Sequence, residues 1–262
     1  MTEPEFNLLG PLEVRCGGHL LPLAAGRQRA LLAALLLNLG RVVPADKLIE
    51  VLWGDGPPPS ARASLHNYVK RLRKALADDA HRRISTYPRG YLIRVEPGGL
   101  DVTRFEALLE AARTAARDGR WEAAAGQACA ALALWRGEPL ADTGSQVLAQ
   151  REGPRLAEMR LQALETGIDA DLHLGRQREV IGTLRSLVAE QPLREPLHAL
   201  LMLALYRDGS QAEALAAYQQ ARVVLLYELG TEPGPRLREL HQQILTTGPS
   251  LVAARPAGGS CY

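Results

Sequence analysis

Three helices are predicted by the spacing of apolar residues in the first third of the chain. Residues 28–39 place leucines on one side of a helix that stops at Gly40. A shorter helix follows over residues 45–53, and the Gly- and Pro-rich residues 54–59 then interrupt the chain. The third helix is expected to begin near Ser60, whose hydroxyl group is placed to cap it. It carries one apolar stripe at i, i+4, i+7 and i+11, formed by Leu65, Val69, Leu72 and Leu76.

Short strands are predicted on both sides of these helices. Residues 6–15 and 19–24 are mostly apolar and are separated by Gly17-Gly18. Residues 84–95 alternate around Pro88-Arg89-Gly90, which is typical of a hairpin with a basic tip. The resulting order of strands, helix, short helix, long helix and hairpin is that of a winged helix-turn-helix with an additional N-terminal sheet.

From Asp101 onward the pattern predicts helices only. Their expected ranges are 101–117, 120–135, 146–174, 177–191, 195–208, 211–229 and 235–245. Gly175 and Gly209 lie 34 residues apart, which is the tetratricopeptide period. Ala214, Tyr218 and Ala221 have the A-x3-Y-x2-A spacing of the second helix in such a repeat.

The repeat is irregular, however. Gly119 and Gly175 are separated by 56 residues, and the proline that usually ends a repeat is missing near Leu226. We therefore predict a mainly α protein with a small β part. It would comprise a winged-helix DNA-binding domain over residues 1–97, a tetratricopeptide-like domain over 98–247, and a flexible tail over 248–262.

The third helix also carries a polar face opposite its apolar stripe. Asn67, Lys70, Arg71 and Lys74 fall on this face, and Arg62 and Arg73 are expected along its flank. An amide beside cations at one-turn spacing suits a DNA duplex, because Asn reads a base edge while Lys and Arg hold phosphates. For the helix taken alone, a solvated surface helix is an equally good interpretation.

The distribution of charge favours the DNA interpretation modestly. The 262 residues carry a net charge of only +2. Residues 1–97 hold 14 Lys and Arg against 9 Asp and Glu, net +5, and the rest of the chain holds 17 against 20, net −3. All three lysines (Lys47, Lys70 and Lys74) lie in the basic part. A basic head on a mildly acidic body is the expected distribution for a chain that binds DNA at one end.

Signatures of enzyme and cofactor chemistry are missing from the sequence. There is no phosphate-binding G-x-x-x-x-G-K-[ST] loop, no G-x-G-x-x-G and no H-E-x-x-H, and neither the histidines nor the cysteines have metal-ligand spacing. We expect no catalytic site, metal or cofactor. Trp53, Trp121 and Trp135 fit a ligand cage less well than three core anchors, because each follows an apolar helical pattern.

A cytoplasmic location without membrane contact is also predicted. The N-terminus lacks a basic region followed by an apolar one, as a signal peptide would have. The longest apolar run, Ala30–Leu37, is too short to cross a bilayer.

In its ordered series of motifs the chain resembles the antibiotic-regulatory-protein (SARP) type of actinobacterial transcriptional activator. Such activators join an OmpR-like winged helix to a bacterial transcriptional activation domain. The motifs that carry the resemblance are LLGPLEV (Leu8–Val14), RQRALLAALLLNLGRVVPADKLIEVLWGDGPP (Arg27–Pro58), YVKRLRKAL (Tyr68–Leu76), PRGYLI (Pro88–Ile93), LDVTRFEAL (Leu100–Leu108), LALWRGEPLAD (Leu132–Asp142), PLREPLHALLMLALYRDGSQAEALAAYQQAR (Pro192–Arg222) and ELGTEPGPRLRELHQQIL (Glu228–Leu245).

This resemblance implies a DNA-binding activator of a secondary-metabolite (antibiotic) gene cluster. It would bind direct repeats in double-stranded promoter DNA, associate with a second copy on that DNA, and recruit the RNA polymerase holoenzyme. The DNA-binding residues would be Arg62, Ser64, Asn67, Lys70, Arg71, Arg73 and Lys74 on the third helix and Arg89 at the wing. The alternative is a tetratricopeptide-like adaptor that binds a protein and has only non-specific affinity for DNA.

Overall fold

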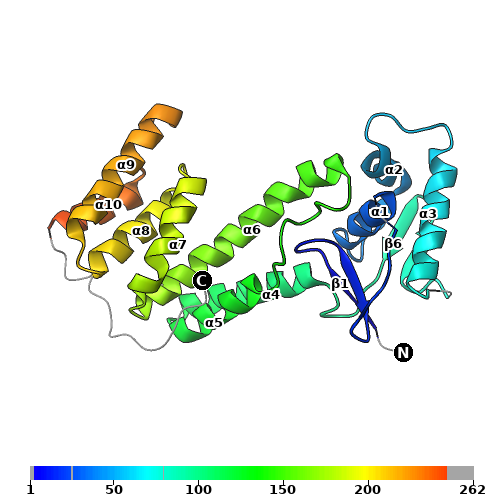
Figure 1. Ribbon diagram of the computed structural model, residues 1–262, viewed down its shortest axis with the longest axis horizontal. Coiled ribbons are helices and arrows are strands. Elements are labelled where there is room, and N and C mark those ends of the chain that lie inside the picture. Colours follow the sequence, from blue (N-terminus) through cyan, green and yellow to red (C-terminus); the bar gives the residue numbers. More distant parts are fainter. Residues whose placement is uncertain (1–2, 25, 79, 247–262) are drawn as a thin grey trace. The chain divides into compact units, whose positions relative to one another are not determined.

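The computed structural model describes residues 3–24, 26–78 and 80–246 (Figure 1). The chain divides into two compact units. The first contains residues 1–107 and 133–160, and the second contains residues 108–132 and the chain from Leu161 onward. Residues 101–160 therefore contribute to both units, and the predicted boundary at residue 97 does not coincide with this division. The flexible tail predicted for residues 248–262 lies outside the described residues.

The first unit contains two small antiparallel sheets. One has the order β1-β2-β3, formed by Pro4–Asn7, Glu13–Cys16 and His19–Leu20. The other has the order β4-β6-β5, formed by Val43–Pro44, Gly90–Ile93 and Ile84–Tyr87. The first predicted strand is thus two strands, because the chain turns at Gly10 and Pro11 between β1 and β2.

Three helices follow the first sheet along the chain, with strand β4 between the first helix and the second. They are α1 (Arg27–Leu36), α2 (Ala45–Trp53) and α3 (Ala61–Ala75), which contact one another and appear in blue to cyan in Figure 1. The predicted stripe of α3 is confirmed, since its four apolar side chains are at most 3% exposed: Leu65, Val69, Leu72 and Leu76. Burial of this stripe fixes which face of α3 remains outside. Ser60 occupies the N-cap position but makes no side-chain capping bond, which corrects the expectation for its hydroxyl group.

Hydrogen bonds join the end of α3 to strand β5. The guanidinium of Arg73 donates to the carbonyl oxygen of Ile84 from Nε and from a terminal nitrogen, at 3.0 and 2.8 Å, and to Thr86 Oγ1 at 2.8 Å. The buried carboxylate of Asp78 accepts the N–H of Arg83 at 3.0 Å and of Ile84 at 2.8 Å. Hydrogen bonds from a guanidinium and to a carboxylate are stronger than those between neutral groups, so these bonds position the hairpin against α3.

The hairpin is also held against the start of α2 through strand β4. Gly90 pairs with Pro44, and a Cβ atom at Gly90 would lie only 1.9 Å from the carbonyl oxygen of Val43. No larger residue fits there unless the strands separate. The backbone carbonyl of Arg89 accepts the N–H of Ala45 at 2.8 Å, so the turn that carries Arg89 is anchored to α2.

The remaining elements are helices, as predicted. They are α4 (Asp101–Arg117), α5 (Trp121–Leu132), α6 (Gln146–His173), α7 (Gln177–Glu190), α8 (Glu195–Arg207), α9 (Gln211–Leu229) and α10 (Pro235–Leu245). In the second unit α7, α8, α9 and α10 pack in sequence around a shared apolar core, drawn in yellow to orange in Figure 1.

The glycines used to find the repeats sit at helix ends. Gly119, Gly175 and Gly209 have φ values of 70°, 75° and 86°, a left-handed conformation that favours glycine and stops each preceding helix. Helix α9 continues for 19 residues to Leu229, where Gly230 ends it with φ 68°. No proline interrupts this helix near Leu226, which explains why its repeat departs from the regular period.

Candidate nucleic-acid interface

Helix α3 presents an exposed polar face opposite its buried stripe. The side chains of Asn67, Lys70, Arg71 and Lys74 are all exposed, as the wheel pattern predicted. Among the described residues, none of the three cations pairs with a carboxylate, and the Arg71 guanidinium lies 6.0 Å from the Tyr68 ring centroid. We name these four residues the α3 face. It offers three positive charges and an amide to an external ligand.

Two further predicted contacts lie nearer the start of α3. Arg62 is exposed and forms an ion pair with Asp46 of α2 at 2.7 Å. Both side chains are more than 70% exposed, so solvent screens the pair and a phosphate competes readily for the arginine. Ser64 is half-buried.

Arg73 was predicted to flank the α3 face, and the structure corrects this prediction. The residue is only 8% exposed, and its guanidinium is committed to Ile84 and Thr86 of strand β5. The helical wheel gives the direction of Cβ but not the course of a long side chain, which here turns back onto the hairpin. Arg73 therefore stabilises the wing and is unavailable to a ligand.

The wing contributes its own cations. Arg89 is exposed in the turn between β5 and β6, where the backbone bond to Ala45 holds the turn in place. Arg94 was not singled out by the sequence; it is exposed and donates to Ser85 Oγ at 2.9 Å and to the Tyr87 hydroxyl at 3.2 Å. Alternation along the hairpin gave no signal for Arg94, since all four residues of β6 before it are buried.

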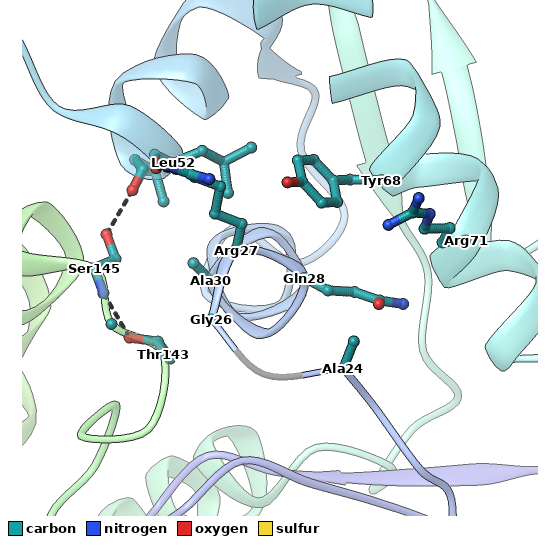
Figure 2. Close-up of a pocket in the computed structure, with 12 residues that line it drawn as sticks. Ala24, Gly26, Arg27, Gln28, Ala30, Leu52, Tyr68, Arg71, Thr143 and Ser145 are labelled. Atoms are coloured by element: carbon teal, nitrogen blue, oxygen red, sulfur yellow. Dashed lines mark hydrogen bonds between the residues drawn. The ribbon is translucent and has the colours of Figure 1, made fainter. Parts of the chain in front are cut away.

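A polar cavity of about 500 Å³ lies beside the α3 face and was also missed by the sequence reasoning (Figure 2). It is lined by Arg27 and Gln28 from α1, by Tyr68 and Arg71 from α3, and by residues 143–145. Ser145 belongs to the wall itself, because its Oγ donates to the carbonyl oxygen of Val51 at 2.7 Å. Segments more than 100 residues apart form this cavity, so local patterns in the sequence carried no signal for it.

The three tryptophans pack in separate places. Trp53 lies 6.2 Å from the Tyr68 ring, Trp135 packs edge-on against Phe105 at 5.6 Å, and Trp121 stacks on His173 at 3.7 Å. They do not converge on one cavity, which agrees with their interpretation as packing residues. Within the described ranges, no group of three or more His, Cys, Asp and Glu side chains is placed to hold a metal ion. No helix of that part of the chain is long and apolar enough to cross a membrane.

Comparison with known protein families assigns both parts of this architecture. Residues 23–93 match the family model of the C-terminal domain of transcriptional regulatory proteins, and residues 100–245 match the model of the bacterial transcriptional activator domain. The fold and the site thus define a transcriptional regulator with an OmpR-like winged helix.

The chain belongs to the antibiotic-regulatory-protein (SARP) family of transcriptional regulators. It is 35% identical to the regulatory protein DnrI of Streptomyces peucetius, with 94% of each chain covered. It is 43% identical to the regulatory protein AfsR of Streptomyces griseus over 96% of this chain and 25% of the relative. The chain therefore spans about a quarter of the length of AfsR.

A solved structure confirms the mainly helical fold with small sheets. Mycobacterium tuberculosis EmbR, determined in complex with a low-affinity phosphopeptide, matches with a TM-score of 0.91 and 38% identity over 95% of this chain and 66% of that one. The family membership also confirms the prediction that the chain is a regulator and not an enzyme.

Proposed function

We propose that the chain is a sequence-specific transcriptional activator that binds promoter DNA through α3 and the wing. The observation that carries this proposal is the α3 face, where three cations that meet no carboxylate of the described residues lie around an exposed amide. Asn67 would read a base edge, and Lys70, Arg71 and Lys74 would hold phosphates. Arg62 and Ser64 would extend the backbone contacts, and Arg89 would contact DNA from the wing.

The test is binding of the full chain to its own promoter region at several salt concentrations. The double variant Lys70→Ala, Arg71→Ala is expected to lose affinity and to lower the salt slope by about two units, one for each phosphate contact. A matched control is Arg236→Ala, Arg238→Ala, which removes two exposed cations from α10. Unchanged binding by the α3 variant, with its fold intact by circular dichroism, would refute the assignment.

The proposal extends to the promoters and the partners. The resemblance supports direct repeats upstream of secondary-metabolite genes, a cytoplasmic location and recruitment of RNA polymerase holoenzyme. One small winged helix makes few contacts, so two copies would bind tandem sites. Direct repeats require a head-to-tail contact between copies instead of a two-fold one. Footprinting on promoter DNA tests this arrangement: two protected repeats in the same orientation are expected, and a single or inverted site would contradict it.

A second candidate function is protein binding by the second compact unit, which we call the helical unit. The outer surface of α9 favours this function. Val223 and Tyr227 are 65% and 85% exposed, and Val223 lines an apolar groove of about 500 Å³ formed by residues of α7, α8 and α9. Exposed apolar surface of this kind is typical of protein interfaces. In an activator this surface would bind RNA polymerase or a second copy of the chain, whereas in an adaptor it would be the main protein-binding site.

The variant Val223→Asp, Tyr227→Asp separates the two functions. An activator would retain DNA binding in a gel-shift assay and lose transcription in a reconstituted assay with polymerase. An adaptor would show the same weak, sequence-independent DNA binding with and without the substitutions.

A further inference from the structure

The first turn of α1 is left open to a ligand. Its N-cap is Gly26, which has no side chain to cap the helix, and the first turn contains no acidic residue. Ala30 is the first residue whose N–H bonds within the helix, to the carbonyl oxygen of Gly26 at 3.0 Å. The N–H groups of Arg27, Gln28 and Arg29 precede it and carry the positive end of the helix dipole. This turn borders the polar cavity beside the α3 face.

A buried and unpartnered side chain points into the same cavity. Gln28 is only 6% exposed, and no hydrogen bond joins its amide to another residue in the described part of the chain. In Figure 2 its side chain extends from α1 toward Arg71. Because its amide has no partner in the described part of the chain, it can bond only to water or to a ligand in the cavity. A bound acceptor would therefore gain a donor that is already in place.

The charges around the cavity specify the kind of acceptor. Arg27 and Arg71 both line it, and no carboxylate is among the lining residues. Arg27 uses Nε for the carbonyl oxygen of Leu52 at 3.3 Å and lies 5.4 Å from the Trp53 ring centroid, while its two terminal nitrogens make no bond to a described residue. Two arginines, a helix N-terminus and a neutral amide donor make a site for an oxyanion.

We propose that this cavity binds a phosphate group. Backbone N–H groups of the first turn of α1 and the Gln28 amide would donate to its oxygens, and Arg27 and Arg71 would neutralise its charge. The volume of about 500 Å³ accommodates a phosphate together with the group that carries it. Tyr68, whose ring lies on the wall, offers a hydroxyl donor.

Two sources supply such a group: the DNA backbone, and free phosphate or a phosphorylated small molecule. Arg71 belongs both to the cavity and to the α3 face, so the cavity opens next to the proposed DNA contacts. The DNA source rests on the proposed function, whereas the free source does not.

The first arm of the test uses inorganic phosphate and no DNA. Titration of the full chain, with chloride at matched ionic strength as the reference, is followed through the amide resonances of Arg27, Gln28 and Arg29. Saturable shifts confined to this turn identify the free source. Gln28→Leu is expected to weaken this binding about tenfold, the typical effect of losing one hydrogen bond to a charged group.

The second arm uses DNA. A specific and an unrelated duplex of equal length are compared by fluorescence anisotropy across a range of salt concentrations. Arg27→Gln is expected to weaken both complexes equally and to reduce the salt slope by about one unit. Gln28→Leu should weaken both about tenfold without changing the slope, because it removes no charge. Arg15→Gln, which removes an exposed arginine from β2, is the control and should change neither.

The outcomes distinguish the two sources of the phosphate group, and they test the phosphate site separately from the proposed function. Binding of phosphate alone supports the free source, and effects seen only with duplexes support the backbone. The phosphate-site proposal is overturned if the resonances do not respond to phosphate and both variants, folded by circular dichroism, bind duplexes like the native chain. If the native chain binds no duplex, the proposed function fails. The titration with inorganic phosphate still tests whether the cavity binds phosphate.

Discussion

The α3 face and the helical unit differ in how their cations are paired. In the helical unit arginines pair with nearby carboxylates, as Arg178 does with Asp208 at 2.6 Å. Other pairs there are Arg185 with Glu213, Arg222 with Glu232, Arg176 with Asp171 and Arg194 with Glu165. On α3, the described residues give Lys70, Arg71 and Lys74 no such partner. Although the total charge is near zero, the α3 face is therefore cationic, because its three cations meet no carboxylate among the described residues.

The largest effect is expected from a substitution in the first unit, where the backbone of the wing contacts strand β4. Gly90→Ala forces a Cβ atom against the carbonyl oxygen of Val43 and separates β4 from β6. We expect a loss of about 3 kcal/mol or more in the free energy of unfolding, because a backbone contact cannot yield as a side chain does. Chemical denaturation measures it, with Gly182→Ala on α7, where a Cβ meets open space, as the control. Equal stability of the two variants would contradict the close approach.

Neighbouring residues on α3 sharpen the distinction between structural and available cations. Arg73→Leu leaves the carbonyl oxygen of Ile84 without its donors, so it should cost about 1–3 kcal/mol of stability. Lys74→Ala should leave the unfolding midpoint unchanged and weaken DNA binding. The pair of measurements is thermal unfolding and anisotropy on the same two proteins. A stable Arg73→Leu variant, or a Lys74→Ala variant that is destabilised and still binds DNA normally, would contradict these roles.

Asn67 tests whether the α3 face reads sequence as well as charge. Asn67→Ala should cost about 1–3 kcal/mol at one base position of the operator and little on a non-specific duplex. Selection of bound sequences from a randomised pool measures this, and Lys70→Ala is the comparison, since it should weaken all sequences alike. An unchanged base preference for Asn67→Ala would show that the amide does not read DNA.

A histidine makes the helical unit sensitive to acid. The His241 ring stacks on Tyr218 at 3.9 Å, and burial lowers the pKa of His241 below its usual value. The folded state thus binds its proton more weakly than the unfolded state does. The stability contributed by the neutral ring is present above the unfolded pKa, near 6.5, and falls as the pH drops below it. His241→Phe should flatten the dependence of the unfolding midpoint on pH between about 7 and 5; an unaltered slope would contradict this.

The smallest effect is expected from the paired arginines. Arg178→Ala should change neither the unfolding midpoint nor DNA affinity measurably, because the Arg178 side chain is 84% exposed and solvent screens its ion pair with Asp208. Denaturation and anisotropy check both quantities. A clear loss of DNA affinity would bring the helical unit into the interface and end the contrast between the units.

Most of the helices were predictable because burial of one face imposes a period on the sequence. The observed ends of α4, α6, α8, α9 and α10 lie within one residue of the predicted ends. Leu65, Val69 and Leu72 similarly fixed the outward direction of α3. Arg73 was misassigned because a side chain with four rotatable bonds is not bound to the direction of its Cβ atom.

The cavity and the division into units required the tertiary structure. Gln28 lies between Arg27 and Arg29, and nothing in its neighbourhood along the chain indicates that its amide faces a cavity shared with residues 143–145. Likewise, α4 and α6 are continuous helices whose two ends belong to different compact units. The apolar period along a helix does not reveal that its two ends pack in different compact units.

Pairing of Gly90 with Pro44 has a consequence for attempts to retarget this regulator to new promoters. The distance between the wing and the helix-turn-helix is set by two main chains in contact, with no side chain between them. Under the proposed function, exchanging the outward side chains of α3 would therefore alter which bases are read without altering the reach of the wing. Libraries confined to Asn67 and its exposed neighbours would explore operator preference on a scaffold of constant geometry.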